Sequence, residues 1–239
     1  MSSKDLLESV KKLREATGVG FKDCKLAIDE CSGDLEKAIE FLRKKGIAKA
    51  SIKMSRTAAE GLCLLYEKNG EVSLIEINCE TDFVAKNETF ISYCKEVSII
   101  NFENKSDLSN VNKAIMKNNL PVETNLTDLI AKMGEKITIR RSIFFDNSNG
   151  KNSFYVHGAL EEKIGKIISI VKISKEDDIG KKIAMHVSAL SPMALEEKVL
   201  SKNIIDKEIE IIKAELLNSG KPPEMIEKIA KGKINKFIS

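Results

Sequence analysis

The spacing of apolar residues changes near residue 58, and this change restricts the folds open to the chain. From residue 4 to residue 46 apolar side chains recur every three or four positions, in three stretches separated by turns at residues 17–20 and 32–34. That spacing predicts three amphipathic helices around a small shared core, with Gly46 ending the third helix. Beyond residue 58 apolar and polar residues alternate, which is typical of strands with one buried face. Helices followed by mixed strands and helices predict an α+β fold.

The order strand, strand, helix occurs twice in the rest of the chain. Strands are predicted at residues 61–66 and 71–79, joined across Asn69-Gly70, with a helix at 87–99. Asn-Gly favours a tight hairpin because both residues tolerate positive φ. The same order recurs at residues 154–160, 166–173 and 179–190, and placing Gly61 on Gly158 brings the two copies into correspondence. We therefore expect two repeated α+β subdomains with antiparallel sheets.

Two helices with apolar stripes are predicted near the end of the chain, at residues 204–217 and after Pro223. They form a helical hairpin. Because two helices alone bury too little surface to be stable, the hairpin must pack on the core, on another chain or on a second copy. The Asn-rich segment 101–128 allows no prediction. The expected domains are a three-helix module at 1–50, a linker at 51–57, subdomains at 58–130 and 131–194, and the hairpin at 195–239.

Charge and cysteine usage argue against several classes of protein. Lys and Arg number 39 and Asp and Glu 36, so the net charge of +3 gives no sign of nucleic-acid binding. The five cysteines form no C-x-x-C pair and the two histidines lie far from them, so neither a metal site nor a cofactor is expected. The sequence shows no signal peptide and no apolar run as long as a membrane span, which favours a soluble cytoplasmic protein.

The segment from Glu80 to Lys86 carries the candidate functional residues. It joins a predicted strand to a predicted helix, and the apolar spacing does not imply that its Phe83 is buried. Phe83 is therefore a candidate for a side chain that docks on a partner. In the alternative, Phe83 folds back as a small extension of the core, and Thr81 or Asp82 caps the next helix. The residue pattern leaves both open.

Several blocks of sequence carry a resemblance to one protein family. The most recognisable, Thr81-Asp82-Phe83-Val84-Ala85-Lys86, is similar to a motif of the elongation factor Ts family. Other blocks, at residues 13–25, 133–137, 155–158 and 184–187, occur in the family's order and at similar spacing, so the resemblance spans nearly the whole chain. Several independent blocks in order are far more specific than one motif.

The resemblance implies an exchange factor that binds the GTPase elongation factor Tu in its GDP form and promotes GDP release, without catalysing a reaction itself. In the family, the loop that corresponds to Thr81, Asp82, Phe83 and Val84 enters the partner's nucleotide-binding domain and disturbs its bound magnesium ion. Displacing a divalent ion from the phosphates weakens nucleotide binding. The resemblance also implies a homodimer or a heterotetramer with the GTPase. The charge balance and the lack of a long apolar run predict no direct contact with nucleic acid or membrane.

Further partner contacts are carried over by position. They are Arg14, Phe21, Lys22 and Lys25 in the three-helix module, Met133 and Gly134 in a loop, and His157 in the second subdomain. Phe21-Lys22 replaces a pair that is often two methionines in relatives. Without the resemblance, Arg14 and Lys25 suit an ordinary solvated helix face, and a solitary histidine at a strand end suits a structural hydrogen bond.

The chain stops at Ser239, where longer members of the family return to the second subdomain with further strands and a helix. We therefore expect apolar residues of that subdomain, namely Ile167 and Ile170, to be exposed.

Two interpretations from other classes compete with the exchange factor. The three-helix start also resembles ubiquitin-associated domains, which favours a protein-interaction module without exchange activity; the partner retained by residues 1–50 alone would discriminate it. An enzyme on the α+β core would require a phosphate-binding loop or a histidine beside a nucleophile, and neither pattern occurs in the sequence.

Overall fold

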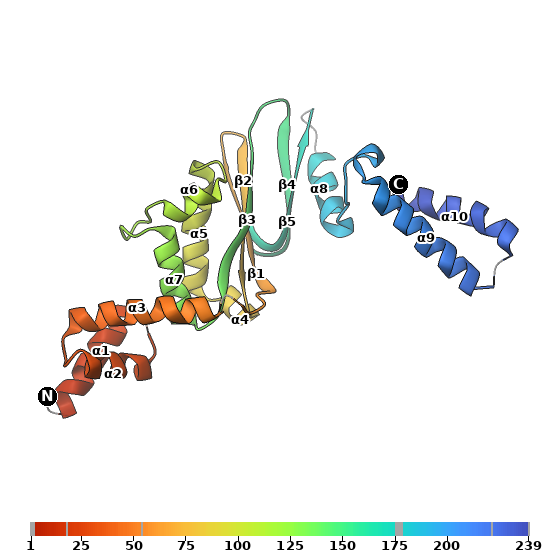
Figure 1. The fold of residues 1–239 in the computed structure, drawn as a ribbon. Helices are drawn as coiled ribbons and strands as arrows, with labels where there is room; N and C mark the ends of the chain where they lie inside the picture. The colour runs from red at the N-terminus through yellow and green to blue at the C-terminus, as the bar shows by residue number, and fades with distance from the viewer. Residues whose placement is uncertain (1–2, 18, 54, 175–178, 221, 239) are drawn as a thin grey trace. The chain divides into compact units, whose positions relative to one another are not determined.

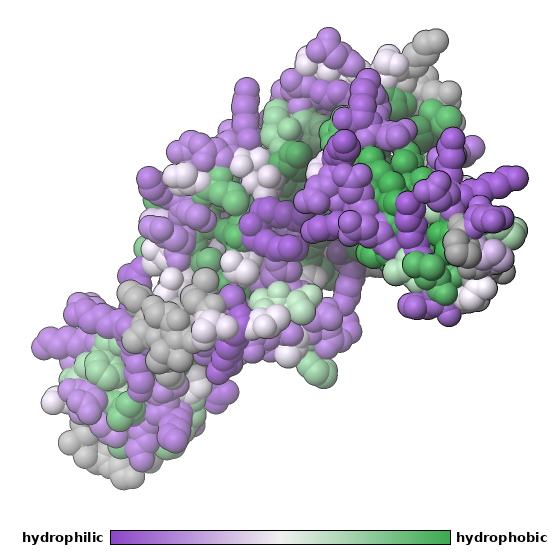
Figure 2. All heavy atoms as spheres, turned by 45° about the vertical axis from the view of Figure 1, so that its right-hand side comes forward, coloured by the Kyte–Doolittle hydropathy of each residue, from purple (hydrophilic) through white to green (hydrophobic). Residues whose placement is uncertain are grey.

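The computed structural model describes residues 3–17, 19–53, 55–174, 179–220 and 222–238. The chain divides into two compact units, residues 1–188 and residues 189–239. The first unit contains a five-stranded antiparallel sheet with helices on both faces (Figure 1), which confirms the predicted α+β class. Hydrophilic side chains cover most of the face drawn in Figure 2. Within the described ranges, no helix is both long enough and apolar enough to cross a membrane.

Three helices form the N-terminal module: α1 (Ser3–Thr17), α2 (Phe21–Glu30) and α3 (Leu35–Lys53). Their apolar faces meet in a core of their own, made of Val10, Leu13, Cys24, Ala27, Ile28, Ala38 and Leu42. The three amphipathic faces predicted from the apolar spacing are therefore confirmed.

Gly46 does not end α3, so the helix end predicted there is wrong. The glycine is buried, and a Cβ atom on it would lie 3.2 Å from the Cβ of Ala131 on α7 (Val122–Met133). A glycine inside a helix costs about 1 kcal/mol relative to alanine, but here it allows α3 and α7 to approach closely. The helix continues to Lys53, into the segment expected as a linker.

The sheet has the strand order β3-β2-β1-β5-β4. Its strands are β1 (Glu60–Lys68), β2 (Glu71–Cys79), β3 (Ile137–Phe145), β4 (Lys151–Glu161) and β5 (Ile164–Ile173). β1 and β2 pair along their whole length and turn at Asn69 and Gly70, whose φ values are 53° and 79°. The hairpin turn predicted from this dipeptide is therefore confirmed.

β3 has no counterpart among the predicted strands. It pairs with β2, and its Ile137 and Ile139 pack in the main core. A bulge in this pairing brings both Arg140 and Arg141 to the carboxylate of Glu76, at 2.7 and 2.6 Å. Apolar and polar residues alternate from Ile137 to Arg140, and an apolar run follows at residues 143–145, so the sequence does carry a signal for this strand.

The two predicted strand pairs meet in one sheet, because β1 also pairs with β5 at Cys63↔Gly165 and Leu64↔Ile164. Helices α5 (Glu88–Glu103), α6 (Leu108–Lys113) and α7 lie on one side of the sheet and α8 (Ile179–Leu190) on the other (Figure 1). The strand, strand, helix order of both copies is confirmed, while the domain boundary expected at residue 130 stays a prediction.

Two clusters of buried side chains hold this unit together. The main core lies between β1, β2, β3 and the helices α4 (Asp82–Ala85), α5, α6 and α7, and it includes the fully buried Phe90. A second cluster, around Leu65, Val72 and Ile168, joins the β1–β2 hairpin to the β4–β5 hairpin. α6 and the first part of α7 lie in the segment 101–128, for which the sequence allowed no prediction.

The prediction that two apolar residues of the second subdomain are exposed is confirmed for Ile167 and wrong for Ile170. Ile167 is 46% exposed, whereas Ile170 is half-buried and packs on the cluster around Ile168. The two residues are an odd number of positions apart, so they lie on opposite faces of β5. One face packs on the β1–β2 hairpin, and the other is only partly covered.

The second unit contains a short 3₁₀ helix (Glu197–Val199) followed by α9 (Lys202–Asn218) and α10 (Pro223–Ile238). α9 and α10 pack against each other around Ile212, Leu216, Ile226, Ala230 and Ile234. The predicted helical hairpin is therefore confirmed.

Candidate functional site

The loop that follows β2 forms a helix of one turn, α4 (Asp82–Ala85). Thr81 precedes it in extended conformation, and its hydroxyl accepts a hydrogen bond from the Val84 backbone N–H at 3.4 Å. Asn87 then caps α5, since its side-chain oxygen accepts from the backbone N–H of Thr89. Thr81 is thus a helix cap, as one of the two alternatives predicts, although it caps α4.

α4 has an inner side and an outer side. Val84 and Ala85 are 7% and 2% exposed and belong to the main core, whereas Phe83 is 82% exposed. The alternative in which Phe83 folds back onto the core is therefore wrong. An aromatic side chain held outside the core on an anchored loop is accessible to a partner.

Two glutamates tie this loop to the segment between α7 and β3. Glu135 accepts hydrogen bonds from the backbone N–H of Glu80 at 3.2 Å, from that of Thr81 at 3.0 Å and from the Thr81 hydroxyl at 2.6 Å. Glu80 accepts one from the Lys136 backbone N–H at 2.6 Å, and the Arg56 guanidinium lies 3.4 Å from it. The hydrogen bond from Lys136, aided by Arg56, holds the pKa of Glu80 below its ordinary value of 4.5.

Asp82 lies at the start of α4 beside Phe83. Its carboxylate pairs with the Lys86 ammonium at 2.7 Å, and 43% of the Asp82 side chain is exposed. The hydrogen bond and the charge of Lys86 lower the pKa of Asp82, and the charge of Lys166 acts in the same direction. The carboxylate is therefore ionised at neutral pH and accessible. Its action on a partner's cation stays a prediction.

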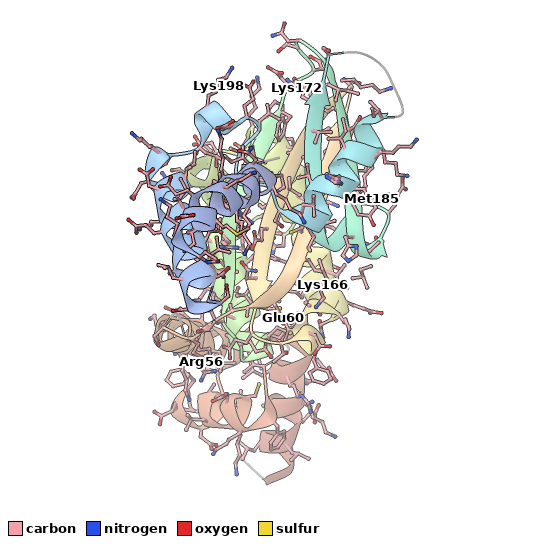
Figure 3. All side chains as sticks on the ribbon, turned by 90° about the vertical axis from the view of Figure 1, so that its right-hand side faces the viewer. Arg56, Glu60, Lys166, Lys172, Met185 and Lys198 are labelled. Atoms are coloured by element: carbon pink, nitrogen blue, oxygen red, sulfur yellow. The ribbon has the colours of Figure 1, made fainter. Side chains whose placement is uncertain are left out.

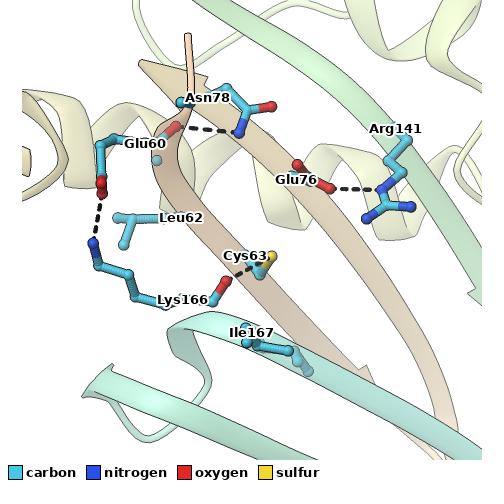
Figure 4. A pocket seen from close by; sticks show the side chains of 11 residues that line it. Glu60, Leu62, Cys63, Glu76, Asn78, Arg141, Lys166 and Ile167 are labelled. Atoms are coloured by element: carbon cyan, nitrogen blue, oxygen red, sulfur yellow. Dashed lines mark hydrogen bonds and ion pairs between the residues drawn. The ribbon is translucent and has the colours of Figure 1, made fainter. Parts of the chain in front are cut away.

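A pocket of about 210 Å³ lies between β1, β2, β3 and β5. The Lys166 ammonium pairs with the Glu60 carboxylate at 2.5 Å, and Glu76 pairs with Arg141 at 2.6 Å. Glu60 and Lys166 are labelled in Figure 3, and Figure 4 marks both pairs with dashed lines. The four charged side chains that line the pocket are thus paired with one another. Burial raises the pKa of the Cys63 thiol to about 11, so this thiol is protonated at neutral pH.

The four candidate contacts in the N-terminal module are all exposed. Arg14 lies on α1, and Phe21, Lys22 and Lys25 lie in the first turns of α2. Phe21 is 45% exposed although it is aromatic. These side chains are accessible, and their contact with a partner stays a prediction.

The other three candidates differ in their surroundings. Met133 packs partly buried against the main core, and Gly134 ends α7 in a left-handed conformation with φ 77°. Both directly precede Glu135, so the structure brings them next to the Phe83 loop. His157 lies exposed on β4, in a different hairpin, with its Nδ1 atom 3.4 Å from the Tyr155 hydroxyl.

Sequence reasoning misses Glu80, Glu135 and Arg56 as residues that shape the loop. One signal for Glu135 exists, since it lies in the block 133–137 that carries part of the family resemblance. Its hydrogen bonds join residues 54 and 55 positions apart, so only the fold reveals them. Among the described residues, no group of three or more His, Cys, Asp or Glu side chains is arranged to hold a metal ion.

Comparison with known proteins identifies relatives along nearly the whole chain. A family model described as Elongation factor TS matches residues 80–239. Elongation factor Ts of Clostridium novyi (strain NT) is 42% identical over 239 residues, which covers 96% of this chain and 77% of the relative. Those of Clostridium acetobutylicum and Methylococcus capsulatus are 40% and 38% identical, again over 96% of this chain and over 77% and 78% of the relatives. The chain therefore belongs to the elongation factor Ts family.

Proposed function

We propose that this chain is a guanine nucleotide exchange factor that binds elongation factor Tu in its GDP form and speeds GDP release during translation elongation. The observation that carries the proposal is the side chain of Phe83, which is 82% exposed on a loop anchored by the core and by Glu135. Membership of the elongation factor Ts family supports the same activity. The chain acts in the cytoplasm and catalyses no covalent reaction of its own.

In this mechanism Phe83 docks into the partner's nucleotide-binding domain, and the ionised Asp82 disturbs the coordination of the bound magnesium ion. The ion neutralises the phosphates, so disturbing its ligands weakens GDP binding. The GTPase binds both GDP and the exchange factor, and these two equilibria are linked. A factor that binds the empty GTPase more tightly than the GDP-bound form must therefore lower the affinity of the GTPase for GDP by the same ratio. Thr81 and Val84 hold the loop, since one caps α4 and the other is buried.

The other candidate residues supply affinity in this scheme. Exposed side chains of the N-terminal module dock the GTPase, namely Arg14, Phe21, Lys22 and Lys25. The segment of Met133 and Gly134, and His157 on β4, add further contacts. Affinity and release rate therefore depend on different residues, which allows them to be tested separately.

Release of a fluorescent GDP from purified elongation factor Tu, with the chain in catalytic amounts, tests the proposal. The intact chain should accelerate release and Phe83→Ala should abolish most of the acceleration. Ile115→Ala is a matched control, because it truncates an apolar side chain that is also exposed, by 59%, outside the loop. Phe21→Ala should raise the concentration needed for half-maximal acceleration without lowering the maximal rate. No acceleration by the intact chain would refute the exchange function.

Chelation of magnesium tests the mechanism separately from the function. If the loop acts by disturbing the magnesium ion, the loop should have little effect on the rate of GDP release once the ion has been removed. The difference between the intact chain and Phe83→Ala should then shrink. A full difference in the presence of chelator would contradict the role assigned to Asp82 and Phe83 at the ion, while the exchange function itself would stand.

A further inference from the structure

A helix as short as α4 cannot hold Phe83 in place by itself. One isolated helical turn is unstable in water, because fixing its backbone costs more free energy than its few hydrogen bonds contribute. The buried side chains of Val84 and Ala85 anchor the inner side of the loop. Its N-terminal end lies beyond Cys79, the last residue of β2, and therefore needs another support.

Glu135 supplies that support. One of its carboxylate oxygens accepts from the backbone N–H of Glu80 and of Thr81, and the other accepts from the Thr81 hydroxyl. Because this hydroxyl donates its proton to Glu135, its lone pairs are available to the Val84 N–H that it caps. A carboxylate suits this position, since it offers acceptors only and its charge strengthens each hydrogen bond.

Glu80 joins the same two segments in the opposite direction. Its carboxylate accepts from the backbone N–H of Lys136, the residue after Glu135. Each of the two glutamates thus satisfies backbone N–H groups of the segment that carries the other. The Arg56 guanidinium, 3.4 Å from Glu80, offsets part of the repulsion between the two carboxylates. The loop is therefore fixed to the segment between α7 and β3 as well as to the core.

We infer that Glu135 is a positioning residue for nucleotide exchange. It holds Thr81, and through Thr81 it sets the place of Asp82 and Phe83. The inference rests on the proposed exchange function, and Glu135 need not touch the GTPase.

A fluorescence measurement on the chain alone tests whether Glu135 holds the loop. The sequence contains no tryptophan, so Phe83→Trp places a single fluorophore on α4. Adding Glu135→Ala should lower its fluorescence anisotropy, because the loop moves more freely. Glu96→Ala is the matched control, since Glu96 also accepts from a backbone N–H, that of Lys117, elsewhere in the fold. Unchanged anisotropy in the Glu135→Ala variant overturns the inference, whatever the exchange assay shows.

The exchange assay tests the consequence for function. Glu135→Ala should lower the maximal rate of GDP release by ~10- to 100-fold, the effect of losing hydrogen bonds to a charged group, with little change in the half-saturating concentration. Glu135→Gln should retain most of the rate, because the amide oxygen still accepts both N–H groups and the Thr81 hydroxyl can accept from the amide nitrogen. Glu96→Ala should match the intact chain.

A variant that lacks both functional side chains of the loop separates positioning from a general structural role. In an Asp82→Ala/Phe83→Ala background, Glu135→Ala should slow exchange no further, because Glu135 acts through these two side chains. A further loss in that background overturns the inference. If the intact chain fails to accelerate release, the exchange function is refuted, and the anisotropy measurement alone decides whether Glu135 holds the loop.

Discussion

Replacing Phe83 by alanine should separate stability from function. Phe83 is 82% exposed, so the fold covers only a small part of its side chain. For a side chain of ~200 Å² the covered area is ~40 Å², which at ~25 cal/mol per Å² limits the lost burial to ~1 kcal/mol. Alanine also has the higher helix propensity, by ~0.5 kcal/mol. We therefore expect the free energy of unfolding to change by less than ~1 kcal/mol.

Phe90 provides the comparison, because it is the same residue type at 0% exposure in the main core. Phe90→Ala leaves a cavity and should lower the free energy of unfolding by ~3–5 kcal/mol. Urea unfolding followed by circular dichroism measures both variants. Phe83→Ala should then show near-native stability with little exchange activity. Phe90→Ala should show the reverse, with exchange retained per folded molecule.

Two results would refute this reasoning. A loss of more than ~2 kcal/mol in Phe83→Ala would mean that the ring packs on the fold in solution, since burial alone cannot supply that much at this exposure. A stable Phe83→Ala variant with full exchange activity would mean that the loop does not drive GDP release.

Three further changes probe the scaffold. Gly61→Ala should lower the free energy of unfolding, measured in urea, by at least ~3 kcal/mol, because φ at Gly61 is 138° and the new Cβ would lie 2.2 Å from the Ile77 carbonyl oxygen. The control is Gly20→Ala, because nothing lies within 4 Å of a Cβ at Gly20. Equal stability of the two variants would contradict this prediction. Since the pKa of Glu80 is lowered on folding, its contribution is complete above the ordinary value of 4.5 and is lost as the pH falls through the lower folded-state pKa. Glu80→Gln should therefore flatten the acid dependence of the thermal midpoint, and an unchanged slope would count against the Lys136 hydrogen bond. Gly46→Leu should push α3 away from α7 and lower the thermal midpoint. At temperatures below the midpoint the variant should keep the helical signal in circular dichroism. An unchanged midpoint would show that the contact between Gly46 and Ala131 is not close in solution.

The sequence alone predicts those turns, strands and helices that are specified by residues close together in the chain. Asn69-Gly70 specifies its turn because both residues tolerate positive φ, whatever surrounds them. Apolar spacing defines the strand at Glu71–Cys79 and the helix at Ile179–Leu190 with the bounds that the structure shows. The order of short motifs along the chain identifies the family. Each of these properties depends on residues close together in the sequence.

The tertiary structure decided what depends on distant segments. Gly46 carries a local stop signal, yet α3 continues through it, and its missing side chain leaves room for Ala131 of α7. The support of Thr81 by Glu135 joins residues 54 positions apart, which no periodic pattern connects. The exposure of Phe83 also depends on segments that are distant in the sequence. An apolar residue in a loop is buried only if a remote segment covers it, and the sequence alone does not show which segment does so.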